Sequence, residues 1–310
     1  MLLCMMLLAG LPALGSALGT SARAVIPADV QQIISVDYRA LKASPTAVAL
    51  KNRVLPDYMK EFEGALAGVG INPDTDVEQL TFASFRGKGA NSSGGLQFVG
   101  IVQGQFTMKK ILARLAAKKV KGVRYRLAAL YPMPGGQDMT FLDDFTMLFG
   151  PRAGVKAALD ARDGEAPALS SGSPVADNMN AVQSGTVWSV LDQAGTQNMM
   201  RSTLGEAAQL ADYEMVKKRI LGSRYTMDFD SGVNFDLDVV TADSMTAATL
   251  SSVLKAGVLF RKATANGVEK IALDSVSVDS DSSNLKLHFK TDNSRFQSLL
   301  QSDLFAQVSK

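Results

Sequence analysis

The sequence contains one histidine and one cysteine, and these counts limit the acid–base, nucleophilic and metal chemistry that the protein can perform. His288 lies in residues 285–290 (LKLHFK), where apolar and basic residues alternate. A period of two places His288 on the polar, solvent-facing side of a strand. The sequence also lacks the G-x-S-x-G elbow that presents a nucleophilic serine in many hydrolases. We therefore expect an exposed strand histidine, not the base of a Ser-His-Asp hydrolase, and we predict no catalytic residue.

Two further patterns resemble ligand sites but lack essential residues. The glycine-rich residues 87–95 contain Gly87, Lys88 and Gly89 without a complete phosphate loop or dinucleotide fingerprint, so we expect a hairpin turn there. Residues 279–283 (DSDSS) place oxygen ligands at alternate positions, as calcium loops do. Asn284 and Lys290 stand where such a loop needs glycine and glutamate, and a polar turn is the better interpretation.

Pairs of carboxylates offer the remaining acid–base chemistry. Asp143 and Asp144 could act as a glycosidase pair, although a turn explains these neighbouring residues equally simply. A second group straddles a predicted hairpin and comprises Asp228, Asp230, Asp236 and Asp238. Alternation predicts that these four line one sheet face, either as a weak calcium site or as a solvated surface, and the solvated surface is commoner. We predict no metal site and no cofactor.

The distribution of charge is the strongest functional signal. Between Gln79 and Gln137 there are ten basic residues and no acidic residue. Residues 25–165 carry 18 basic and 14 acidic side chains, whereas residues 166–310 carry 13 and 16. The predicted anion-binding face consists of Lys109, Lys110, Arg114, Lys118 and Lys121. Such a face would bind lipid headgroups, envelope polysaccharide or an acidic protein. Binding to headgroups would be a peripheral contact with the membrane.

The alternatives are a contact with the acidic half of the same chain, or plain solvated surface. We expect no nucleic acid partner, because few aromatic residues accompany the basic ones.

Residues 1–24 have the composition of a signal peptide. They are mainly apolar and end in Ala22-Arg23-Ala24, the small-x-small pattern of a cleavage site. Glycines and Pro12 interrupt the apolar run, so a cleaved leader is favoured over an uncleaved membrane anchor. Only three residues precede Cys4, too few for a lipoprotein signal. Cleavage after Ala24 would leave an exported chain without cysteine, hence without disulfides or thiolate metal sites.

The elements that must position these residues alternate between short strands and helices. With 46% hydrophobic and 20% charged residues the chain is not disordered. We predict strands over residues 32–37, 80–86, 96–103, 123–130, 139–142, 146–149, 186–191, 225–229, 233–240, 271–278 and 285–289. We predict helices over residues 45–68, broken near Pro56, and over 107–119, 151–159, 198–221, 244–261 and 293–305.

The order of these elements recurs, and it predicts an α+β fold of two similar units with mixed or antiparallel sheet, produced by internal duplication. The first unit covers residues 25–162 and the second residues 178–310. Residues 163–177 are rich in Pro, Gly, Ser and Ala and are predicted to form the linker.

Two blocks resemble a family of uncharacterised exported bacterial proteins. Residues 27–45 (PADVQQIISVDYRALKASP) are similar to the family's opening turn, strand and Ser-Pro-capped helix. Residues 141–160 (FLDDFTMLFGPRAGVKAALD) are similar to its strand pair, Gly-Pro junction and helix. The resemblance implies a fold and supplies no catalytic residues.

These observations predict an exported, non-enzymatic envelope protein, periplasmic or extracellular, that acts by binding. One alternative is a periplasmic carrier that holds a lipid or other apolar ligand between sheet and helices. The other is a carboxylate-dependent hydrolase.

Overall fold

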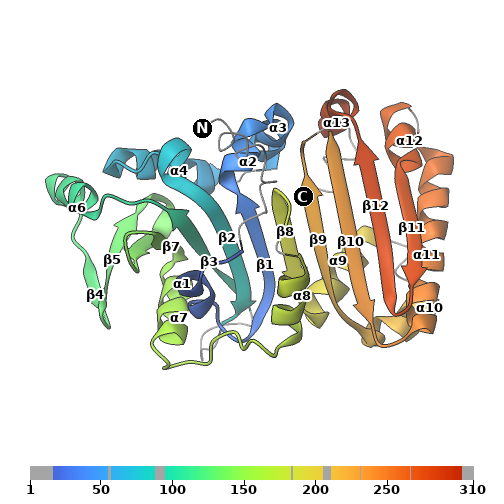
Figure 1. The fold of residues 1–310 in the computed structure, drawn as a ribbon, viewed down its shortest axis with the longest axis horizontal. Helices are drawn as coiled ribbons and strands as arrows, with labels where there is room; N and C mark the ends of the chain where they lie inside the picture. The colour runs from blue at the N-terminus through green and yellow to red at the C-terminus, as the bar shows by residue number, and fades with distance from the viewer. Residues whose placement is uncertain are drawn as a thin grey trace, which may run out of the picture.

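The computed structural model describes residues 17–54, 57–87, 95–182, 184–204, 211–230, 232–265 and 267–301. Within these ranges the chain builds one continuous sheet in the order β11-β12-β10-β9-β8-β1-β2-β3-β7-β6-β5-β4 (Figure 1). Neighbouring strands are antiparallel throughout. Helices pack against this antiparallel sheet, and the predicted α+β class is confirmed.

The strands are β1 (Val30–Asp37), β2 (Val77–Arg86), β3 (Leu96–Gly104), β4 (Val123–Tyr125), β5 (Ala128–Met133), β6 (Gln137–Phe141), β7 (Thr146–Pro151), β8 (Val187–Leu191), β9 (Ile220–Asp228), β10 (Val233–Thr241), β11 (Val276–Asp281) and β12 (Asn284–Thr291). The helices are α1 (Thr20–Ala24), α2 (Tyr38–Ala43), α3 (Pro45–Val54), α4 (Asp57–Val69), α5 (Pro73–Asp76), α6 (Met108–Ala117), α7 (Arg152–Arg162), α8 (Pro174–Val182), α9 (Gln193–Leu204), α10 (Ala211–Val216), α11 (Ser244–Thr264), α12 (Gly267–Asp274) and α13 (Asn293–Leu300). Short 3₁₀ turns are η1 (Pro134–Gly136) and η3 (Lys217–Arg219).

The two halves of the sheet share the order of their first five strands. From the centre outward these are β1-β2-β3-β7-β6 and β8-β9-β10-β12-β11, and the first half then continues with β5 and β4. The antiparallel pair β1 and β8 joins them, so the two predicted units share one sheet. The common order agrees with the predicted duplication, and descent from one ancestral unit stays a prediction.

Residues 163–177, predicted as the linker, are hydrogen-bonded to the segment that precedes β1. The backbone N–H of Leu169 donates to the carbonyl of Ile26, and that of Ala28 to the carbonyl of Pro167. From Pro174 the segment is already part of α8, which packs on the sheet. The connection therefore contributes to the core that both halves share.

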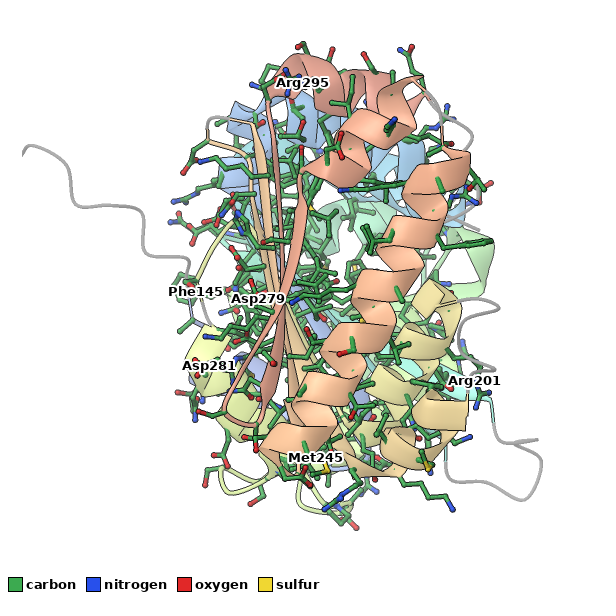
Figure 2. All side chains as sticks on the ribbon, turned by 90° about the vertical axis from the view of Figure 1, so that its right-hand side faces the viewer. Phe145, Arg201, Met245, Asp279, Asp281 and Arg295 are labelled. Carbon is green, nitrogen blue, oxygen red and sulfur yellow. The ribbon has the colours of Figure 1, made fainter. Side chains whose placement is uncertain are left out.

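Alternation along the strands divides the apolar residues between the two sheet faces. On one face, Ile33 of β1 lies in register with Val190 of β8, and both pack under α1, α7 and α8. The opposite face is covered by α4 and α6 in the first half and by α9, α10 and α11 in the second. Figure 2 shows α11 on this side, while at this end the other face carries no helix of the described chain.

Most predicted elements are confirmed, including the 143–144 turn, whereas the predicted helix break at Pro56 lies outside the described residues. The strand predicted over 123–130 is wrong. The chain instead forms the hairpin β4–β5, in which Val123 pairs with Leu130. Arg126 at its tip adopts a left-handed φ of 52°. A short folded-back hairpin replaces a longer exposed edge strand, an arrangement that protects sheet edges.

Two other predicted elements change type in the structure. The helix predicted over 198–221 ends early, and Ile220 enters β9, where it pairs with Thr241. The strand predicted over 271–278 begins only at Val276, because residues 267–274 form α12. In α12 the apolar residues Val268 and Ile271 are three positions apart, which is a helical spacing. The short alternation of apolar and polar residues after Ile271 had instead favoured a strand. Local patterns were overridden here by pairing with distant strands.

Candidate functional site

Helix α6 and the residues that follow it carry the predicted anion-binding face, and α6 lies at one end of the molecule (Figure 1). Ile111 and Leu115 are buried against α4 and the sheet, and this fixes which side of the helix faces water. The five predicted residues are all exposed, namely Lys109, Lys110, Arg114, Lys118 and Lys121. Within the described ranges none of them forms an ion pair with a carboxylate. Their exposure was predicted correctly, and anion binding itself stays a prediction.

The structure separates these cations into groups. Lys110, Arg114 and Lys118 are spaced four residues apart and form one stripe along α6, called the α6 stripe below. A methyl group added at Gly70 would collide with the guanidinium of Arg114, and one at Gly68 would lie 2.7 Å from Nζ of Lys118. Both cations therefore lie over the C-terminal turn of α4, where helix carbonyls favour positive charge.

Lys109 belongs to a different environment. It lines an open groove of about 660 Å³ together with Asp76, Asp144 and the half-exposed ring of Phe145. Carboxylates oppose Lys109 there, so this groove would not attract an anion as the α6 stripe would. Asp143 and Asp144 form the predicted turn, in which the carboxylate of Asp143 accepts the N–H of Phe145 at 2.8 Å.

The first turn of α6 is electrostatically unfavourable. It contains Lys109 and Lys110 and no acidic residue, and the side chain of Thr107 forms no capping hydrogen bond. The N-terminus of a helix carries a partial positive charge and is stabilised by anions, so two cations at this place repel it. Because Lys109 faces the carboxylates of the groove, Lys110 is the cation of this turn whose charge an external anion could neutralise.

His288 lies on the open polar face of β12, as the alternation predicted. Its Nδ1 lies 2.7 Å from the Oδ1 of Asp236 on β10, and Ser277 on β11 is in register on its other side. The sequence analysis missed this row of serine, histidine and aspartate, which only strand register could reveal. No hydrogen bond joins Ser277 to His288 in the described structure, and the N–H groups of β10 and β12 serve the sheet.

The clustered aspartates of the second half meet cations or donors. Asp238 pairs with Arg224 at 2.9 Å, and Asp228 accepts the backbone N–H of Thr186 at 2.7 Å. Lys286, 3.0 Å from Asp281, is the main cause that lowers the pKa of this carboxyl group. This is the predicted solvated face, with charges of alternating sign. Within the described ranges, no group of three or more His, Cys, Asp or Glu side chains could hold a metal ion.

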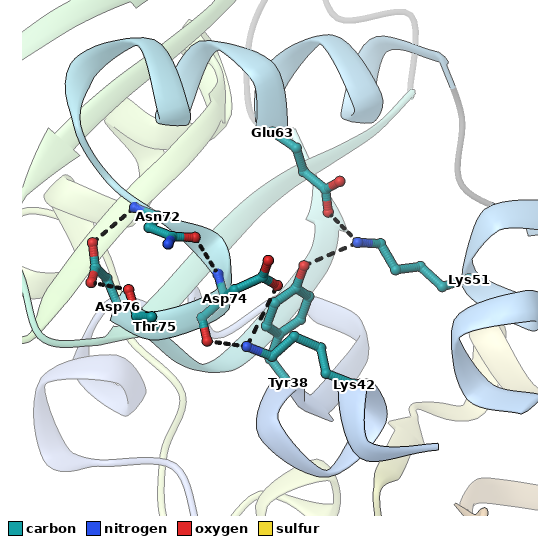
Figure 3. A network of polar contacts seen from close by, with 8 residues as sticks. All are labelled: Tyr38, Lys42, Lys51, Glu63, Asn72, Asp74, Thr75 and Asp76. Atoms are coloured by element: carbon teal, nitrogen blue, oxygen red, sulfur yellow. Dashed lines mark hydrogen bonds and ion pairs between the residues drawn. The ribbon is translucent and has the colours of Figure 1, made fainter. Parts of the chain in front are cut away.

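A polar network that the sequence analysis missed joins α2, α3 and α4 (Figure 3). Nζ of Lys51 donates to the hydroxyl of buried Tyr38 at 3.0 Å and lies 2.7 Å from a carboxylate oxygen of Glu63. Lys42 also lies over the Tyr38 ring and pairs with Asp74. Burial is the main cause that raises the pKa of Tyr38. No sequence spacing points to this network, because its members come from different helices.

Comparison with known proteins gives only distant structural likeness. No protein-family model and no curated protein matches the sequence. In the described part of the chain, no helix combines the length and apolarity that crossing a membrane requires. A crystal structure of the protein TP0453 (crystal form I) covers 90% of this chain and 97% of its own, with a TM-score of 0.49 and 9% identity. A second structure (crystal form IV) covers 90% and 96%, with a TM-score of 0.47 and 9% identity. The chain is thus distantly similar in shape to TP0453, and no property of TP0453 is carried over to it.

Proposed function

We propose that the protein is an exported, non-enzymatic binding module of the cell envelope that contacts an anionic lipid surface through the α6 stripe. Export is supported by the apolar leader and the small residues that follow it. The observation that carries the binding proposal is the exposed set of cations on α6 without carboxylate partners in the described ranges.

Several other cations pair with carboxylates, although Lys218, Lys270 and Lys290 form no ion pair in the described ranges either. Arg126 pairs with Asp160 at 2.6 Å, Arg224 with Asp238 at 2.9 Å and Lys262 with Asp274 at 3.0 Å. Carboxylates of the same chain thus neutralise these positive charges. On α6 the same charge is available to an external anion.

Exposed apolar side chains on α6 and on the hairpin β4–β5 suit a membrane interface. Leu112 on α6, Val123 on β4 and Leu127 at the hairpin tip have exposed fractions of 40%, 51% and 86%. Figure 1 shows α6 and β4 at the same end of the molecule. Basic residues interspersed with exposed apolar ones can contact headgroups and the acyl boundary together.

The rival interpretation, a contact with the acidic half of the same chain, is not supported by the arrangement of the elements. Figure 1 places α6 at the end of the molecule opposite to β11, β12 and α11. The acidic residues of the second half are therefore too distant to neutralise the α6 stripe at physiological ionic strength.

Binding to vesicles tests the proposal. Reversal of the stripe by Lys110→Glu, Arg114→Glu and Lys118→Glu should weaken binding to vesicles containing phosphatidylglycerol more than about a hundredfold, since each basic residue near such a surface contributes about 1 kcal/mol. Added salt should weaken wild-type binding, and vesicles of phosphatidylcholine alone should bind poorly. Co-sedimentation at several salt concentrations measures both effects.

A matched control keeps the same change in net charge. Lys218→Glu, Lys270→Glu and Lys290→Glu alter exposed residues of the second half and should leave vesicle binding close to wild type. The melting temperature of the stripe variant should stay within about 3 °C of wild type. Equal loss in both variants would show that only net charge matters. A much lower melting temperature of the stripe variant would show that its cations serve α4 instead.

No specific observation favours either alternative. In the described part of the chain, the groove beside Lys109 is open and mainly polar. The hollow beside His288 is lined by both polar and apolar side chains, and its volume is only about 220 Å³. The carrier and the hydrolase stay as untested hypotheses.

A further inference from the structure

The end of the apolar leader is built into the core of the described structure. Leu18 and Ala22 have exposed fractions of 4% and 0%, and the following Val25 and Ile26 are fully buried. All four belong to the core cluster under α1, α7 and α8. A segment discarded before folding would not be expected to supply core residues, because buried apolar side chains are a main source of stability.

Polar contacts hold this segment at both ends. Nε of Arg23 donates to the carbonyl of Leu18 at 3.2 Å. Its Nη1 lies 3.4 Å from Oδ1 of Asn180 on α8. The carbonyl of Ile26 accepts the N–H of Leu169 at 2.8 Å. A methyl group added at Gly19 would lie 2.8 Å from Nε2 of Gln103 on β3, so the backbone approaches the sheet closely there.

Cleavage after Ala24 would disturb this packing. It would remove Leu18 and Ala22 from the core and uncover the sheet beneath them.

The sequence offers an earlier cleavage site. Gly15-Ser16-Ala17 is also a small-x-small triplet, and the apolar residues 1–14 before it have the length of a signal-peptide core. Ala17 is exposed, so the chain reaches the surface immediately before this bond, whereas Leu18 after it is already part of the core. Cleavage after Ala17 would therefore remove an apolar leader and keep the buried residues of the 18–24 segment.

We propose that processing occurs at the Ala17–Leu18 bond and that residues 18–24 remain as part of the mature fold. A water molecule adds across this peptide bond, so that Ala17 leaves with a carboxylate and Leu18 begins the mature chain with an ammonium group. This inference rests on the proposed export and concerns where, not whether, the leader is removed.

The N-terminus of exported protein tests this bond. The full chain is expressed in a Gram-negative host, and the exported fraction is analysed by intact mass and N-terminal sequencing. We expect a chain that begins at Leu18. A chain that begins at Val25, or at any other residue, overturns the proposal, and a chain that keeps Met1 also contradicts export. Binding to vesicles is measured separately, so failure of the binding proposal is distinguishable.

Two substitutions provide the matched control. Ala17→Asp places a charged side chain at the last leader residue and should block processing, because that position requires a small residue. Ala24→Asp makes the same change at the other triplet and should leave the N-terminus at Leu18. The reverse result would assign processing to Ala24.

Stability provides a measurement independent of export. A chain produced in the cytosol from Leu18 should melt at least about 5 °C higher than one produced from Val25, since the shorter chain lacks buried Leu18 and Ala22. Equal melting temperatures would show that the segment contributes nothing to the mature fold and would overturn the proposal.

Discussion

Tyr38 and Lys51 show how neighbouring groups set each other's protonation. Burial raises the pKa of the Tyr38 hydroxyl, the hydrogen bond from Lys51 lowers it, and the charge of Glu63 raises it again. For Lys51, burial lowers the pKa, but the contacts with Glu63 and Tyr38 outweigh burial and the pKa is raised. The folded chain therefore holds both protons more tightly than the unfolded chain does.

This pair predicts a loss of stability at alkaline pH. Stability from raised pKa values is fully present below about pH 10 and decreases above it, because only the unfolded chain releases the protons there. Tyr38→Phe removes one of the two titrations and should flatten this decrease, while costing about 1 kcal/mol at pH 7 for the lost hydrogen bond. Urea unfolding between neutral and strongly alkaline pH measures the slope.

Tyr131→Phe removes a tyrosine hydroxyl outside the Tyr38–Lys51–Glu63 network and serves as the matched control. If Tyr38→Phe and wild type lose stability equally between pH 9 and 11, the alkaline transition belongs to other groups.

At the scale of an element, α4 shows how one helix end prepares the candidate site. Gly70 has a left-handed φ of 87°, and the N–H of Ile71 donates to the carbonyl of Leu66, as in a Schellman ending. This ending turns the chain away beneath Arg114 of α6. The α6 stripe thus lies over a helix terminus that favours cations, which helps to hold the stripe in place.

Two glycines of this region predict opposite effects of the same substitution. Gly64 lies inside α4 with open space around its missing side chain, so Gly64→Ala should stabilise the protein by about 0.5–1 kcal/mol. Gly70→Ala should destabilise it by about 1–2 kcal/mol, because alanine is strained in the left-handed conformation and would meet Arg114. Urea unfolding followed by circular dichroism compares the two. Changes of the same sign would contradict the described ending of α4.

At the scale of the whole molecule, the continuous sheet couples the two halves. Trp188, the only tryptophan of the chain, is buried in β8 within the core cluster that contains Ile33 of β1 and Val155 of α7. Residues from both halves therefore share one hydrophobic core, and separation of the halves would expose it together with two long strand edges.

We expect one cooperative unfolding transition. Trp188 fluorescence and far-UV circular dichroism should give the same urea midpoint. Ile33→Ala in the first half and Leu285→Ala in the second both remove fully buried side chains, and each should cost about 2–5 kcal/mol. In one cooperative unit both substitutions lower the midpoint of both probes. If Leu285→Ala leaves the urea midpoint of Trp188 fluorescence unchanged, the two halves unfold separately.

The sequence by itself determined the features that depend on local periodicity. Alternation placed His288 on an exposed strand face, and the apolar spacing of Ile111 and Leu115 predicted both α6 and the exposure of its basic residues. The α+β class followed from the order of strands and helices. These features were predictable because one buried face is enough to fix a short element.

Only the tertiary structure decided which distant residues meet. The row Ser277, His288 and Asp236 depends on strand register, and the Tyr38–Lys51–Glu63 network on the packing of separate helices. The helix α12 and the hairpin β4–β5 replaced predicted strands because pairing and packing with distant segments outweighed local pattern. The burial of Leu18 and Ala22 likewise required the sheet that covers them. Contacts between segments that are distant in the sequence produce no local pattern of residues. They could therefore not be predicted from periodicity or spacing along one sequence.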